Sequence, residues 1–109
     1  MLQKDYPVVL PDYILTLEEL SPENCLFFDI ETTGLSWKTS HLYLLGAVFY
    51  ENETWIHRQW FCQKPGEEKE VLLAFSELLS TKKLLFHYNG TTFDVPYLMH
   101  KYTFYQLPS

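Results

Sequence analysis

Two acidic residues, Asp29 and Glu31, stand near the end of an apolar segment, residues 26–35, which reads Leu-Phe-Phe-Asp-Ile-Glu-Thr-Thr-Gly-Leu. If this segment is a strand, alternate side chains share a face, so both carboxylates point to the same side of the sheet. The neighbouring residues are apolar on both faces, which predicts a central strand covered on both sides. Two like charges that lose solvation need a cation or a shared proton, and a divalent metal ion meets that need. Taken alone, however, Asp-x-Glu is a short pattern that usually marks solvated charge.

A third acidic residue, Asp94, stands at the expected start of a helix, just after an expected strand over residues 84–88. An acid in the first turn of a helix commonly does no more than complement the helix dipole. If strand 84–88 neighbours the first strand, Asp94 comes to the same end of the sheet as Asp29 and Glu31. These three carboxylates are therefore the candidate metal ligands.

The hydrophobic pattern predicts the strands that position these acids. The first covers residues 25–30, and two more over 41–50 and 54–62 are joined by a short polar connection, which favours an antiparallel hairpin. The last of these carries His57-Arg58-Gln59 in mid-run, which favours an edge position. Gly34 ends the first strand and can take a positive φ that other residues resist.

A helix is expected from about residue 67 to residue 80, after the turn at Pro65-Gly66. Its first turn is acidic, which favours the helix dipole, and its apolar residues recur at helical spacing. That stripe is Val71, Leu72, Phe75, Leu78 and Leu79, and the acids are Glu67, Glu68 and Glu70. The succession of strand, helix and strand predicts a crossover that returns strand 84–88 parallel to the first strand. A second helix begins near Phe93, capped by Thr91 or Thr92, with Pro96 tolerated in its first turn.

Length and composition limit the classes of protein. The chain has 109 residues, 47% of them hydrophobic, so it is one small domain or part of a larger one, with enough apolar material for a core. Its net charge of −6 argues against a broad basic nucleic-acid surface, but an acidic site can hold phosphate through bound ions. Cys25 and Cys62 show no metal-ligand or disulfide spacing, which predicts a reduced, cytoplasmic chain. We see no membrane span and no signal peptide.

The motifs resemble those of a known group of nucleases. Residues 28–35, Phe-Asp-Ile-Glu-Thr-Thr-Gly-Leu, resemble the first motif of the DEDD 3′–5′ exonuclease superfamily, and residues 89–94, Asn-Gly-Thr-Thr-Phe-Asp, resemble the second. The Tyr-Asn-Gly before Phe-Asp and the Pro-Tyr-Leu after it are most similar to the YprB-like ribonuclease-H-like domain family. The resemblance runs from about Glu23 to Tyr102. It implies an α/β, ribonuclease-H-like mixed sheet with three antiparallel strands, a helix, a parallel strand and a second helix.

The resemblance also implies a site. Asp29, Glu31 and Asp94 would bind two divalent ions, Mg²⁺ or Mn²⁺, which clamp the scissile phosphate and activate the attacking water. The substrate would be a single-stranded end of DNA or RNA. The implied substrate contacts are Thr32, Thr33, Gly34, Leu35, Asn89 and Phe93. Phe93 is equally well explained as a core aromatic.

The sequence departs from that family after Asp94. Active members supply a fourth carboxylate, preceded by a His or Tyr, from a last helix, whereas residues 95–109 contain no acid. We therefore expect residues 23–109 to be the N-terminal part of an incomplete domain, truncated before the last strand and helix, with residues 1–22 as a lead-in. Such a chain would have little activity and low solubility by itself, unless the missing C-terminal segment or another chain completes it. The alternative is a catalytically incomplete nucleic-acid-binding or protein-interaction module of the same fold.

Overall fold

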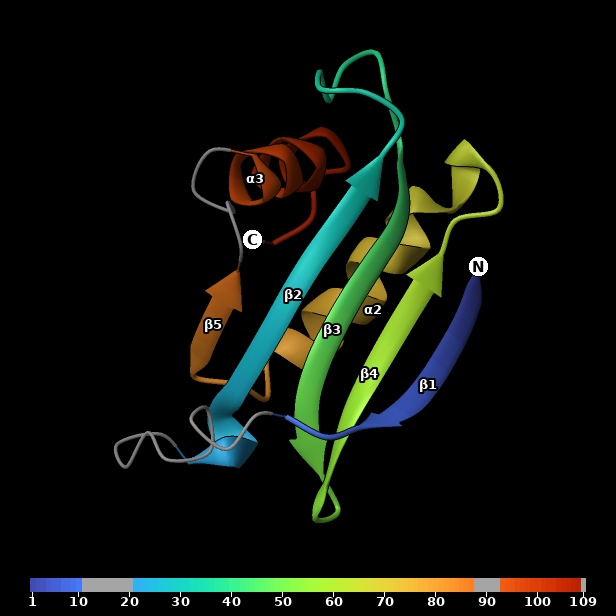
Figure 1. Cartoon of the computed structure of the whole chain (residues 1–109). Helices are drawn as coiled ribbons and strands as arrows, with labels where there is room; N and C mark the ends of the chain where they lie inside the picture. The colour runs from blue at the N-terminus through green and yellow to red at the C-terminus, as the bar shows by residue number, and fades with distance from the viewer. Residues whose placement is uncertain (11–20, 88–92, 109) are drawn as a thin grey trace.

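The computed structural model describes residues 1–10, 21–87 and 93–108, which form a mixed sheet packed against helices (Figure 1). Within these residues, five strands lie in the order β1-β4-β3-β2-β5. The elements are β1 (Leu2–Val8), η1 (Pro22–Asn24), β2 (Cys25–Thr32), β3 (Leu42–Glu51), β4 (Thr54–Phe61), η2 (Pro65–Glu67), α2 (Glu68–Leu79), β5 (Leu84–His87) and α3 (Asp94–Phe104). In this described part, no helix is long and apolar enough to cross a membrane.

Strand β2 lies between β3 and β5 and organises the sheet. It pairs antiparallel with β3 from Leu26↔Phe49 onward, and parallel with β5 from Cys25↔Leu84 to Phe28↔His87. The chain reaches β5 from β4 through α2, so the predicted parallel crossover is confirmed. The predicted α/β mixed sheet, with three antiparallel strands, a helix, a parallel strand and a second helix, is likewise confirmed.

The two faces of β2 differ. Leu26, Phe28 and Ile30 are buried in one cluster with residues of both α2 and α3, whereas Asp29 and Glu31 on the other face are exposed. The prediction of a strand covered on both sides is therefore wrong for the described part of the chain. In that part of the chain, no second layer covers Asp29 and Glu31, so these two carboxylates stay accessible to solvent. Any shift of a pKa at this site must therefore come from the immediate surroundings of the group.

Strand β1 is an outer strand that the sequence pattern did not reveal. It pairs antiparallel with β4 along its whole length, from Leu2↔Phe61 to Val8↔Trp55. The edge position predicted for β4 is therefore wrong, and the polar Arg58 is accommodated because its guanidinium donates to both carboxylate oxygens of Asp5 on β1, at 2.8 and 2.9 Å. Residues assigned to a lead-in thus include a strand of the sheet. Residues 11–20 lie outside the described residues.

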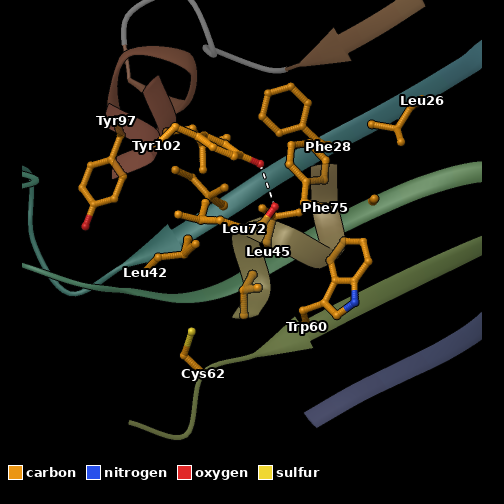
Figure 2. Close-up of a cluster of buried hydrophobic side chains, with 14 residues drawn as sticks. Leu26, Phe28, Leu42, Leu45, Trp60, Cys62, Leu72, Phe75, Tyr97 and Tyr102 are labelled. Carbon is orange, nitrogen blue, oxygen red and sulfur yellow. Dashed lines mark hydrogen bonds between the residues drawn. The ribbon is translucent and has the colours of Figure 1, made fainter. Parts of the chain in front are cut away.

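Helix α3 is fastened to α2 through the core (Figure 2). Val71, Leu72 and Phe75 of α2 are buried, as the helical stripe predicted. The Tyr102 hydroxyl of α3 donates to the Leu72 carbonyl at 2.8 Å, as Figure 2 shows. The same hydroxyl accepts from the Ser76 hydroxyl at 2.7 Å. This attachment holds α3, and the acid at its first position, beside β2.

The β3–β4 hairpin offers a stability prediction. Asn52 and Glu53 form its two-residue turn, and both have positive φ, 52° and 64°, as in a type I′ turn. A left-handed conformation costs a non-glycine residue about 1–2 kcal/mol, and glycine avoids it at a backbone entropy cost of about 0.5–1 kcal/mol. We expect Glu53→Gly to raise the free energy of unfolding by about 0.5 kcal/mol, measured by urea denaturation. Asn52→Gly is the control and should gain less, because asparagine tolerates this conformation. A loss of stability in Glu53→Gly would contradict the argument.

Candidate metal centre

Asp29 and Asp94 meet at one backbone amide. The Ile30 N–H lies 3.0 Å from Asp29 Oδ1 and 3.3 Å from Asp94 Oδ2, so both carboxylates accept from the same donor. Asp29 reaches this amide from its own strand, and Asp94 reaches it from the first position of α3. The structure therefore brings these two predicted ligands together from distant parts of the chain.

The environment of Asp94 opposes its charge. Its side chain is nearly inaccessible, with the residue 4% exposed. Burial first, and then contact with the Asp29 carboxylate, raise the pKa of Asp94 to about 6, while the Ile30 N–H acts in the opposite direction. A group in this state either keeps a proton that it shares with its neighbour or needs a cation in place of that proton. When both carboxylates are ionised, the site therefore lacks a positive charge to balance them.

Glu31 lies near the Asp29–Asp94 pair but does not form a compact three-carboxylate cluster with it. Its negative charge contributes to the raised pKa of Asp94, so it lies within electrostatic range. Among the described residues, however, no three His, Cys, Asp or Glu side chains form a ready-made metal cage. The β2–β3 register also shifts between Glu31 and Thr32, which pair with Leu44 and Leu42, and irregularities of this kind re-aim side chains near functional sites.

The donors present nevertheless fit a hard divalent cation. All three candidates are carboxylates, the ligand type that Mg²⁺ and Mn²⁺ prefer. Asp29 and Glu31 are exposed, whereas Asp94 is buried against the Ile30 amide. One acid is thus held by the fold, and the other two face solvent, where an ion would arrive. Their role as metal ligands stays a prediction.

The turn after β2 uses its own threonines to hold its shape. The Thr32 hydroxyl donates to the Gly34 carbonyl at 2.7 Å, and the Thr33 hydroxyl accepts from the His41 N–H at 2.9 Å. Both hydroxyls therefore bond to the backbone of the loop that carries them. Leu35 follows as an 88% exposed apolar side chain, so it is an accessible member of the predicted substrate-contacting set.

Gly34 is favoured for a reason other than the predicted one. No described glycine has a positive φ, so the expectation that Gly34 uses this conformation is wrong. An added Cβ at Gly34 would instead lie 3.2 Å from the Cβ of Ser40. A glycine here lets residues 34 and 40 approach closely, and the loop closes against itself.

Of the two remaining predicted substrate contacts, the structure describes Phe93 but not Asn89. Phe93 precedes α3, is half-buried against the core cluster, and has its ring 5.4 Å from that of Tyr97. Of its two alternative roles, this packing favours the core aromatic. Asn89, together with the proposed caps Thr91 and Thr92, lies in 88–92, outside the described residues.

A buried ion pair beside the turn escaped the sequence analysis. Lys101 Nζ lies 3.0 Å from Glu68 Oε2, with both side chains at most 6% exposed. Glu68 also accepts from the Leu42 N–H at 2.8 Å and from the Tyr105 hydroxyl. Glu68 was interpreted as one of several acids that favour the helix dipole. The missed signal is the place of Lys101 on the buried face of α3, in line with Tyr97 and Leu98, where a lysine needs an anionic partner.

The fold is that of an α/β domain. Its strand β2 and the first residue of α3 bring carboxylates together at one end of the sheet. A family model described as the RNase_H superfamily matches residues 26–109, and the chain belongs to this superfamily. It is also similar to YprB of Bacillus subtilis (strain 168), with 32% identity over 93 residues. This match covers 84% of the chain but 22% of YprB, so the chain spans about a fifth of its relative's length. The resemblance stated from the motifs is confirmed at the superfamily level.

Proposed function

We propose that this chain carries part of the metal centre of a nuclease that hydrolyses phosphodiester bonds. Membership of the superfamily indicates a nuclease-like domain. The observation that carries the proposal further is the contact of Asp29 and Asp94 at the Ile30 amide, with the raised pKa of Asp94 that results. The motif wording supports a 3′–5′ exonuclease that acts on a single-stranded end of DNA or RNA.

Different residues of the chain would bind the metal ions and contact the substrate. Asp29, Glu31 and Asp94 would hold Mg²⁺ or Mn²⁺, which when bound neutralises phosphate charge and lowers the pKa of a water molecule. The buried Asp94 keeps its position because α3 and the Ile30 amide fix it. The exposed Leu35 would provide an apolar contact for the terminal base, since its side chain has little contact with the rest of the protein.

We further propose that a fourth carboxylate comes from a partner segment or chain. The exonucleases that the sequence resembles use four acids, and the described residues hold no closed cluster of even three. We therefore expect the chain by itself to bind Mn²⁺ weakly and to turn over little or not at all. The same observation favours a second candidate, a nucleic-acid-binding or protein-interaction module of this fold without catalysis.

Metal binding tests the proposal directly. We expect Asp29→Asn and Glu31→Gln each to weaken Mn²⁺ binding by about tenfold or more, measured by isothermal titration calorimetry near pH 7.5. Glu51→Gln is the matched control, an exposed glutamate at the end of β3 that lies outside the candidate centre, and it should bind Mn²⁺ as the wild type does. Equal affinities in all variants would remove the basis for the metal centre.

Turnover then separates the two candidates. Single-stranded oligonucleotides labelled at the 5′ or the 3′ end would be incubated with the chain and Mn²⁺. Stepwise shortening from the 3′ end that Asp29→Asn abolishes would support the exonuclease. Metal and oligonucleotide binding without any cleavage, even after addition of the C-terminal part of a longer relative, would favour the binding module.

A further inference from the structure

Ser40 closes the loop that follows β2. Its hydroxyl lies 2.6 Å from the Ser36 carbonyl, 3.2 Å from the Gly34 carbonyl and 2.8 Å from the Tyr97 hydroxyl. A serine hydroxyl has one proton to donate and accepts through its lone pairs. Donation to the loop carbonyls therefore leaves Ser40 free to accept from Tyr97. The half-buried Ser40 thus connects the loop to α3.

The backbone of Ser40 is held from the same direction. Its carbonyl accepts from Lys101 Nζ at 2.9 Å, and Lys101 is paired with Glu68 inside the protein. Glu68 in turn accepts from the N–H of Leu42, where β3 begins. Side chains of α2 and α3 therefore fix the loop at Ser40 and again just beyond it.

The helix that holds Ser40 is also the helix that holds the metal-centre acid. Tyr97 and Lys101 share the buried face of α3 with Asp94 at its start. One rigid element therefore sets both the position of Asp94 at the Ile30 amide and the position of the loop that contains the exposed Leu35. The close approach of Gly34 to Ser40 brings these two parts of the loop together.

We infer that Ser40 is a positioning residue, which holds the turn of residues 32–35 in a fixed relation to Asp29 and Asp94 so that a bound nucleic-acid strand meets the metal centre in register. This inference rests on the proposed function and deepens it. Ser40 itself binds no metal in this scheme. Its loss should therefore weaken contacts with the strand and leave the affinity for the ion unchanged.

The test compares Ser40→Ala with Ser76→Ala. Both serines are half-buried, and each is hydrogen-bonded to a tyrosine of α3, but Ser76 bonds to Tyr102 in the core, away from the loop. The probes are Mn²⁺ alone and, in the presence of Mn²⁺, a single-stranded oligothymidylate with a phosphorothioate 3′ end. A hydrogen bond worth about 0.5–1.5 kcal/mol corresponds to about a two- to thirteenfold effect. We expect Ser40→Ala to lose that much affinity for the oligonucleotide at an unchanged Mn²⁺ affinity, and Ser76→Ala to lose neither.

Amide hydrogen exchange provides a readout that does not depend on binding. The Thr33 N–H donates to the His41 carbonyl, and the His41 N–H donates to Thr33, so both amides report on the closed loop. They should exchange faster in Ser40→Ala than in wild type or in Ser76→Ala. Tyr97→Phe, which removes only the hydroxyl that meets Ser40, should show a smaller change in the same direction, with Tyr102→Phe as its control.

The outcomes separate this inference from the proposed function. Unchanged exchange at Thr33 and His41 in Ser40→Ala would overturn the inference, and so would an equal loss of Mn²⁺ and oligonucleotide affinity, which indicates general loosening. A wild-type chain that binds neither probe would overturn the proposed function together with the substrate part of the inference. Faster exchange at Thr33 and His41 in Ser40→Ala but not in Ser76→Ala would in that case still support the positional part.

Discussion

Replacing Lys101 with methionine is expected to lower the free energy of unfolding by about 3–5 kcal/mol. The substitution keeps most of the side-chain volume but removes the cation that lies 3.0 Å from Glu68 in the interior. The Glu68 carboxylate would then stay buried without its counter-charge, and the Ser40 carbonyl would lose a donor. Urea denaturation followed by tryptophan fluorescence measures the loss.

Two further variants make this result specific. Arg58→Met breaks the more exposed ion pair with Asp5, in which Arg58 is 23% and Asp5 40% exposed, and pairs of that kind contribute at most about 1 kcal/mol. Glu68→Gln combined with Lys101→Met should lose less than Lys101→Met alone, because a neutral amide still accepts from Leu42 and leaves no buried charge. A single-variant loss as small as that of Arg58→Met would show that water reaches the Glu68–Lys101 pair.

In metal-free buffer, the contribution of Asp94 to the stability of the wild type is expected to fall as the pH rises from about 4 to about 6. The pKa of Asp94 in the folded protein is raised from 3.8 to about 6. Between these values the folded state keeps a proton that the unfolded state has released, so raising the pH favours unfolding. Above pH 6 both states are ionised and the penalty is constant. Asp94→Asn removes this contribution and should raise metal-free stability near neutral pH by at most about 3 kcal/mol, the value that corresponds to the full pKa shift.

Adding Mn²⁺ should reduce the difference in stability between wild type and Asp94→Asn, and should reverse it once Mn²⁺ is far above its dissociation constant. An ion that binds the folded state alone stabilises it in proportion to the logarithm of its concentration over the dissociation constant. Thermal unfolding near pH 7.5 with increasing Mn²⁺ should therefore raise the Tm of wild type and leave that of Asp94→Asn unchanged. Glu51→Gln, outside the candidate centre, should follow wild type at every pH and metal concentration. A metal-free Asp94→Asn less stable than wild type near neutral pH would contradict the raised pKa as the source of the effect.

The elements that the sequence pattern predicted are those with a strong local signal. The apolar run of β2, the β3–β4 hairpin and the stripe of α2 each appear within a short window. The approach of Asp94 to Asp29 was also predictable, because parallel strands run to the same edge of a sheet. Asp29 lies in one such strand, β2, and Asp94 follows the other, β5. This reasoning needs only that β5 neighbours β2 and runs parallel to it, and both of these points were correct.

Other features depend on partners that no local window contains. Strand β1 is mostly exposed and contains Pro7, so its pattern resembles a loop, and only its pairing with β4 defines it. The open face of β2 was mistaken for a buried one because Phe27 is apolar. Its ring is stacked on Phe86 at 4.9 Å and meets the edge of Trp55 at 6.2 Å, within the sheet itself. The Glu68–Lys101 pair joins α2 to α3, and the sequence around either residue does not indicate which residue it pairs with.

The donor that unites Asp29 and Asp94 belongs to the main chain, and this affects how the site would tolerate genetic change. The Ile30 side chain points into the core, while its N–H serves both carboxylates. Any residue except proline supplies the same N–H, so evolutionary drift at position 30 can alter the packing without removing this anchor. A mutation can remove either carboxylate, whereas the backbone N–H that both carboxylates accept from is kept as long as the strand forms and position 30 is not proline.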